Sequence, residues 1–123
     1  MATPRFLRYA AVGAVATATH YLVLVLCVEG GQWPAFLASG FGAVVGAQVA
    51  YGGNRWFTFA HRGDIVASWW RFQGTALVGA LFGMIVVALA VRAGWHYVLA
   101  QMLATALALV LTYFINRRWT FGR

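Results

Sequence analysis

The sequence predicts an all-α membrane protein of four transmembrane helices, built as two tandem helical hairpins in parallel repeat with both termini in the cytoplasm. The 123 residues are 63% hydrophobic and only 9% charged, with a mean hydropathy of +0.76, whereas about a quarter of the residues in soluble domains are charged. The apolar residues fall into four long runs, and one segment recurs in each half of the chain. These observations indicate that the solvent around the fold is lipid.

Each apolar run is about long enough to cross a hydrocarbon core of roughly 30 Å as a helix rising about 1.5 Å per residue. Helices are expected because backbone polar groups in lipid must be satisfied within the segment. The runs are also too long and too evenly apolar for barrel strands. The predicted spans are Tyr9–Val28, Pro34–Tyr51, Phe72–Val91 and Trp95–Ile115.

The arginines predict the orientation of the spans. With four spans, the N-terminus, the 52–71 loop and the C-terminus lie on one side, and this side carries eight of the nine arginines. Only Arg92 lies on the other side, so the positive-inside rule places both termini in the cytoplasm. The net charge of +7 could also suggest nucleic acid as a partner, but the arginines lie only between the apolar runs, and no nucleic-acid partner is expected.

The two halves of the chain share a nine-residue segment. Residues 51–59, YGGNRWFTF, recur 62 positions later as residues 113–121, YFINRRWTF, with five identities. The starts of the two hairpins, Arg8-Tyr9 and Arg71-Phe72, correspond at a spacing of 63. We therefore predict a single membrane domain, 1–123, with repeat 1 at 5–59, repeat 2 at 68–121 and a cytoplasmic loop at about 60–67. The repeats are expected to be parallel rather than inverted.

The repeated Asn-Arg-x-x-Thr-Phe motif has two interpretations. Arginine and aromatic residues at a cytoplasmic helix end are typical of simple membrane anchoring. The same motif in both halves also suits a lipid phosphate at headgroup depth, since arginine offers a planar fork to phosphate and asparagine supplies an amide. The sequence leaves both interpretations open.

At these residues the sequence resembles the GtrA-like family of small membrane proteins, over nearly the whole chain. The resemblance implies a flippase, or a flippase component, that moves a polyprenyl-phosphate-linked monosaccharide across the bacterial inner membrane for cell-surface polysaccharide glycosylation. It also implies a membrane glycosyltransferase as a partner. A related branch implies the alternative, a non-transporting subunit that anchors or stabilises such a glycosyltransferase. The positions that the resemblance places beside the lipid phosphate are Asn54, Arg55, Thr58, Asn116, Arg117 and Thr120, with Arg8 and Arg71 nearby.

Three polar residues, His20, Gln48 and Gln101, lie inside the predicted spans. Polar groups inside a membrane usually face a bundle interior or a cavity. For Gln48 and Gln101 the simplest interpretation is an interhelical hydrogen bond, and for His20 it is a packing role. A sugar contact or proton coupling is the functional alternative for His20.

No catalytic residues, metal site or cofactor are expected. The two carboxylates, Glu29 and Asp64, fall on opposite sides of the predicted membrane, so the chain is not expected to be an enzyme. Gly42 with Gly46, and Gly79 with Gly83, form ridges of small residues that suit close helix packing either within the chain or between copies. Because four helices enclose little interior, a homo-oligomer is expected. A small multidrug exporter or fluoride channel is a further alternative. The exporter is disfavoured because no carboxylate lies in the middle of the first span, and the channel because dual-topology channels avoid a strong arginine bias.

Overall fold

The computed structural model describes residues 2–58 and 65–115, and within these two segments every regular element is a helix. The prediction of an all-helical chain is therefore confirmed, and the four helices cover the four predicted runs. The first and third helices begin about two turns before their apolar runs. The elements are α1 (Ala2–Val25) with the π-helical continuation η1 (Leu26–Gly30), α2 (Ala35–Gly52) with the π-helical continuation η2 (Gly53–Thr58), α3 (Ile65–Arg92) and α4 (Tyr97–Ile115).

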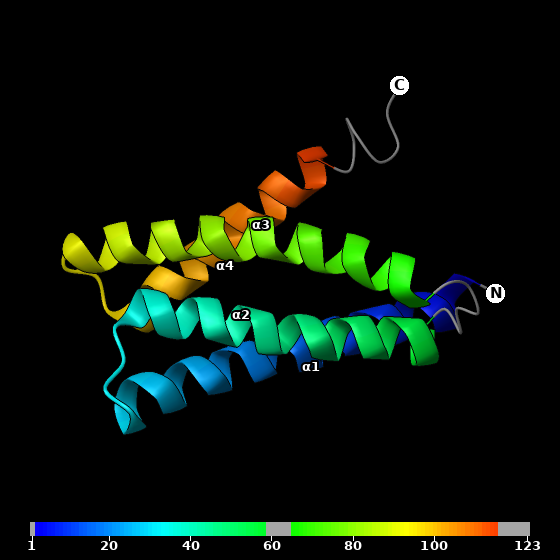
Figure 1. Cartoon of the computed structure of the whole chain (residues 1–123), viewed down its shortest axis with the longest axis horizontal. Coiled ribbons are helices and arrows are strands. Elements are labelled where there is room, and N and C mark those ends of the chain that lie inside the picture. Colours follow the sequence, from blue (N-terminus) through cyan, green and yellow to red (C-terminus); the bar gives the residue numbers. More distant parts are fainter. Residues whose placement is uncertain (1, 59–64, 116–123) are drawn as a thin grey trace.

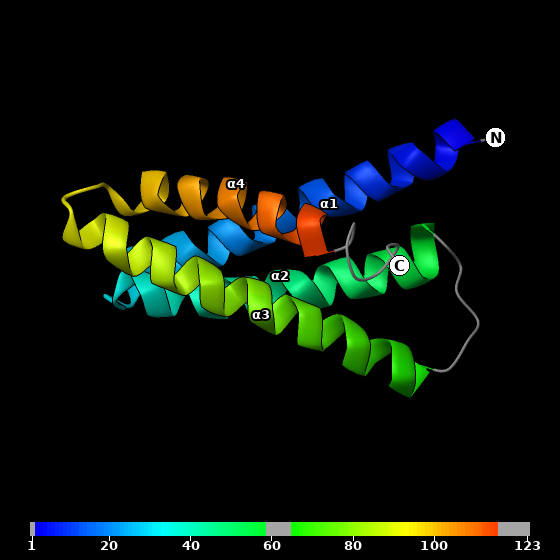
Figure 2. The same cartoon turned by 90° about the horizontal axis from the view of Figure 1, so that it is seen from above.

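Two tight turns at the same end of the molecule make α1–α2 and α3–α4 antiparallel hairpins (Figures 1 and 2). In the first turn, the backbone N–H groups of Gly31 and Trp33 both donate to the Cys27 carbonyl, at 3.1 and 3.0 Å. In the second turn, Gly94 has a φ of 100°, a left-handed conformation that glycine adopts at little cost. The predicted pair of hairpins is thus present.

The bundle packs small residues inside and large apolar residues outside. Most of its buried apolar residues are alanines, and leucine, valine and phenylalanine side chains cover the outer surface. In water such a surface would be costly, whereas in lipid it is the expected outer face, with small residues allowing close helix approach. Helices that follow each other in the chain pack extensively against one another, while α1 and α4 make far less contact with each other.

The ridge of Gly42 and Gly46 serves packing within the chain. A Cβ on Gly42 would lie 2.7 Å from the His20 carbonyl oxygen, and one on Gly46 would lie 2.9 Å from that of Ala16. These glycines therefore let α2 lie directly against the backbone of α1. In the second hairpin, a Cβ on Gly83 would lie 4.0 Å from that of Ala104, an ordinary contact.

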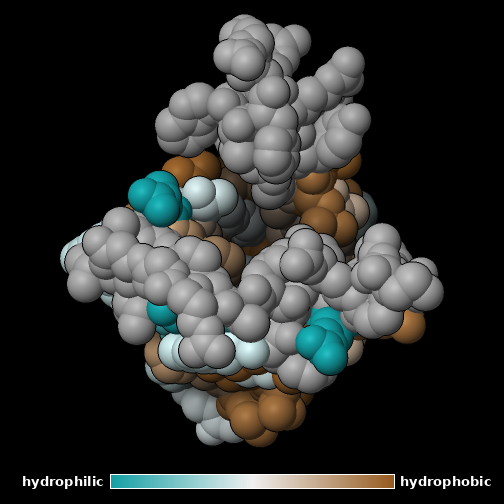
Figure 3. Space-filling view, turned by 90° about the vertical axis from the view of Figure 1, so that its right-hand side faces the viewer, coloured by the Kyte–Doolittle hydropathy of each residue, from teal (hydrophilic) through white to brown (hydrophobic). Residues whose placement is uncertain are grey.

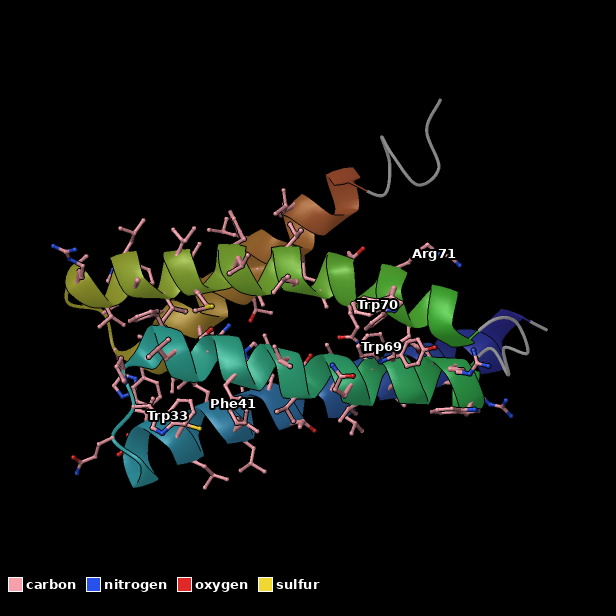
Figure 4. The ribbon with its side chains drawn as sticks, in the orientation of Figure 1. Trp33, Phe41, Trp69, Trp70 and Arg71 are labelled. Atoms are coloured by element: carbon pink, nitrogen blue, oxygen red, sulfur yellow. The ribbon has the colours of Figure 1, made fainter. Side chains whose placement is uncertain are left out.

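Three helical segments are long and apolar enough to cross a membrane: Ala10–Gly30, Ala35–Trp56 and Trp69–Arg92. Within the described residues, α4 contains a shorter apolar helix, Tyr97–Leu111. Tryptophans lie toward both ends of the bundle, as Figure 4 shows for Trp33 beside the α1–α2 turn and for Trp69 and Trp70 at the start of α3. Such aromatic belts are common at the two membrane–water interfaces.

Candidate functional site

The first copy of the repeated motif lies in the π-helical segment η2, at the end of α2 opposite the hairpin turns. A π-helical turn is rare and often accompanies a functional site. Here it carries Asn54 and Arg55, and the Arg55 side chain is only 8% exposed. A Cβ on Gly53 would lie 2.7 Å from Val12, so this glycine allows α1 to pack tightly beside the motif. Arg55 is therefore enclosed by the bundle, where the sequence suggested an arginine at the membrane surface.

Aromatic rings connect the motif to the neighbouring helix. The Tyr51 ring lies edge-on to Phe72 of α3, with centroids 5.5 Å apart, and edge-on to Trp56 at 6.5 Å. The Arg55 guanidinium carbon lies 5.7 Å from the centroid of the Trp56 ring, within cation–π range. These contacts fix the end of α2 against the start of α3.

Asn54 contributes a buried acceptor. Its Oδ1 atom is buried and has no hydrogen-bond partner among the described residues. Buried polar atoms without partners are rare, and each calls for a physical explanation. Arg8 and Arg71, near the starts of α1 and α3, belong to the same end and are exposed. In Figure 4 Arg71 points away from the bundle.

The remaining predicted motif residues cannot be compared with the structure. Thr58 ends η2, but its side chain lies outside the described residues, as do Asn116, Arg117 and Thr120 entirely. Figure 3 looks onto this end of the bundle, where hydrophilic residues (teal) lie in a few separate places and hydrophobic residues (brown) lie on the flanks.

Two of the three predicted intramembrane polar residues meet in one hydrogen-bond network. The His20 Nε2 atom donates to the Ser39 carbonyl oxygen at 3.1 Å, and the Ser39 hydroxyl donates to the Gln101 Oε1 atom. The Gln101 amide in turn donates to the Thr105 hydroxyl at 3.3 Å, and the Tyr21 hydroxyl lies 2.8 Å from the same Thr105 oxygen. The network joins α1, α2 and α4 and is one of the polar connections between the two hairpins.

Gln48 lies apart from this network. Its side-chain amide exchanges two hydrogen bonds with that of Gln73 on α3, at 2.8 and 3.1 Å, on an exposed face. The interhelical hydrogen bond predicted for Gln48 is thus present, and Gln48 does not line the site.

The network borders a cavity of about 270 Å³ between the two hairpins. All four helices line it, mostly with alanine and glycine, and it is partly open to the surroundings. On α2 the lining extends from Ser39 to Ala50, a rise of about 16 Å. Arg55 lies a further five residues along, so the cavity approaches the motif to within about two helical turns.

Sequence reasoning missed four residues of this arrangement: Tyr21, Ser39, Gln73 and Thr105. Serine and threonine are common in apolar helices and gave no signal on their own. Ser39 could have been found through the repeat, because it is 62 residues from Gln101 and therefore occupies the corresponding position in repeat 1.

Comparison with known proteins identifies the family. The model of the GtrA/DPMS transmembrane domain matches residues 8–121. No curated protein and no solved structure matches the chain. The match covers both hairpins and both copies of the motif, and it confirms the resemblance seen in the sequence. The chain is a multi-pass membrane protein that belongs to the GtrA/DPMS transmembrane domain family.

Proposed function

We propose that this protein translocates a polyprenyl-phosphate-linked monosaccharide across the bacterial inner membrane, alone or as the membrane component of a flippase. Family membership supports a role with such lipids. The proposal includes four spans with both termini in the cytoplasm, supported by the hairpins and the arginine distribution. The 19 residues of α4 rise about 28 Å, close to the thickness of a hydrocarbon core.

The observation that carries the proposal is the cavity with hydrogen-bonding side chains between the hairpins. Polar groups inside a membrane are costly and usually face the bundle interior or a water-filled cavity. A subunit that only anchors a glycosyltransferase needs apolar packing and an interface, but no such cavity. A flippase needs a polar route for the headgroup, so the cavity favours translocation over the anchoring alternative.

Arg55 supports a phosphate site at the cytoplasmic end. A guanidinium held at a fixed position by the bundle offers several N–H donors in a planar fork suited to phosphate. In the proposed arrangement Arg55, Asn54 and Thr58 receive the phosphate in repeat 1, and Asn116, Arg117 and Thr120 do so in repeat 2. Arg8 and Arg71 add positive charge at the same end.

We further propose that the chain catalyses no covalent reaction and needs no metal or cofactor, since its two carboxylates are predicted to lie on opposite sides of the membrane. A membrane glycosyltransferase would supply the lipid substrate. A homo-oligomer is part of the proposal, although the cavity itself lies within one chain.

Reconstitution tests this function directly. The purified chain in proteoliposomes is expected to move a polyprenyl-phosphate hexose from one leaflet to the other, measured by accessibility of the sugar to an added glycosidase or lectin. Arg55→Ala and Arg117→Ala should each abolish the movement, because each removes the charge that receives the phosphate.

Arg92→Ala is the matched control, because it removes an arginine from the opposite end of the bundle. It should retain the wild-type rate. If translocation survives both motif changes, the phosphate-binding role of Arg55 and Arg117 is wrong. If the wild-type chain moves no lipid but raises sugar-lipid synthesis when it is reconstituted with a membrane glycosyltransferase, the anchoring alternative replaces it.

A further inference from the structure

We infer that the cavity between the hairpins is a binding site for one uncharged, hydroxyl-rich monosaccharide headgroup during its passage, with the His20–Ser39–Gln101–Thr105 network as its recognition surface. The inference rests on the proposed function and deepens it, because it names the part of the lipid that the cavity receives and the chemical class of sugar that fits.

The cavity brings together residues that correspond in the two halves of the sequence. Ser39 and Gln101 are 62 residues apart, which is the spacing of the repeated motif, and their side chains are hydrogen-bonded. Three further lining pairs each contain one hydrogen-bonding residue and one small apolar residue: Thr17 with Ala80, His20 with Gly83, and Thr105 with Ala43.

The combination of one hydrogen-bonding residue and one small residue in each pair suits a sugar. Where one repeat supplies a hydroxyl or imidazole, the other supplies only a methyl group or a hydrogen and leaves space opposite it. Hydroxyls both donate and accept, and an amide oxygen has two acceptor sites, so the bonds within the network leave capacity for a ligand. A sugar ring, with hydroxyls around its edge, matches such a surface.

The size of the cavity suits a headgroup of one sugar. Pockets for drug-sized ligands are about 300–1,000 Å³, and this cavity of about 270 Å³ lies just below that range. It has room for a single monosaccharide unit.

The charge of the lining limits the kind of sugar. Among the described residues that line the cavity none is Asp, Glu, Lys or Arg. A carboxylate on the sugar would therefore lose its water inside the membrane without gaining a counter-ion there, which is costly. An uncharged hexose loses only hydroxyl hydration, which the network replaces.

Two lipids and a graded series of variants test the inference. We expect wild-type proteoliposomes to move a polyprenyl-phosphate hexose about a hundredfold faster than the matching hexuronate, since a buried uncompensated charge costs about that factor. Both lipids carry the same phosphodiester, so its own cost of crossing cancels from the comparison.

Residue 79 can fill the cavity without a clash in the described structure. Gly79 lines the cavity, and a Cβ there has nothing within 4 Å. Along the series Gly79→Ala, Gly79→Val and Gly79→Leu, the rate for the hexose lipid should fall step by step. Gly74, an exposed glycine of the same helix whose Cβ would also meet nothing within 4 Å, does not line the cavity. The same three changes at Gly74 should leave the rate unchanged.

The outcomes distinguish a failure of this inference from a failure of the proposed function. If the two lipids cross at equal rates, or if the Gly79 series behaves like the Gly74 series, the cavity is not the headgroup site, while translocation itself stands. If the wild-type chain moves neither lipid, the proposed function is wrong, and the inference with it. The small Gly79→Ala change keeps the test valid where the larger variants do not fold.

Discussion

At the scale of single residues, the molecule depends on a few polar side chains inside an apolar bundle. The sequence predicted that His20 and Gln101 face the bundle interior or a cavity, because polar side chains inside a membrane usually do so. Gln48 is the exception, since it pairs with Gln73 on an exposed face. The sequence could not predict that His20 and Gln101 share Ser39, since that contact depends on how two hairpins dock. The same limit applies to Arg55, whose burial depends on how the helices pack around the end of α2.

The Ser39–Gln101 hydrogen bond should contribute measurably to stability. Interhelical hydrogen bonds in membranes are worth about 0.6 kcal/mol on average and up to about 1.7 kcal/mol. Because this bond is buried, we expect a coupling energy of about 1 kcal/mol in a double-mutant cycle of Ser39→Ala and Gln101→Ala. The measurement is unfolding by SDS in mixed micelles.

Thr75→Ala provides the comparison for this cycle. The Thr75 hydroxyl donates to the Arg71 carbonyl within its own helix, on an exposed face. Paired with Gln101→Ala, this change should show additive effects. Equal coupling for both cycles would show that the Ser39–Gln101 contact does not join the hairpins energetically.

At the scale of helices, the sequence predicted the elements well, because helix type and length in lipid follow from hydrophobic runs alone. The two π-helical segments were not predicted, since the choice between i→i+4 and i→i+5 bonding depends on tertiary packing rather than on composition. The small-residue ridges were visible in the sequence, but the neighbouring helix that each ridge contacts was not. The structure shows that the Gly42–Gly46 ridge faces α1 and leaves this surface unavailable for contacts between copies.

Replacing glycine with alanine should have opposite effects on the free energy of unfolding at Gly46 and at Gly74. In Gly46→Ala the new methyl group meets the Ala16 carbonyl oxygen at 2.9 Å, so α1 and α2 must separate. We expect a loss of about 1–3 kcal/mol in the free energy of unfolding. Gly74→Ala meets nothing within 4 Å and should gain about 0.5–1 kcal/mol through the entropy of the unfolded chain. Unfolding titrations of both variants check this, and a neutral Gly46→Ala would contradict the packing described for α1 and α2.

At the scale of the whole molecule, two hairpins pack side by side. All four helices line the cavity between them, with polar side chains from α1, α2 and α4 and only small apolar residues from α3. The sequence predicted the duplication from its motif but also predicted that four helices enclose little interior. The space between the hairpins of one chain is about 270 Å³ and is partly open to the surroundings.

The four-span topology can be measured by cysteine labelling in a Cys27→Ala background. Single cysteines at Gln32 and Ala93, in the two turns, should react with a membrane-impermeant maleimide added to intact cells, once it has access through the outer membrane. Cysteines replacing Ala2 and Arg123 should react only after the inner membrane is opened. Labelling of position 123 in intact cells would mean that α4 does not complete a fourth span.

The central claim is that a lipid phosphate is received at Arg55, beside the cavity that takes the sugar. The most direct test is a pair of cryo-electron microscopy maps of the chain in lipid nanodiscs, with and without a polyprenyl-phosphate hexose. The account predicts a phosphate density in contact with the Arg55 guanidinium and present only with the added lipid. A phosphate ordered instead at the Arg92 end, or lipid bound only to the outer surface of the bundle, would contradict it.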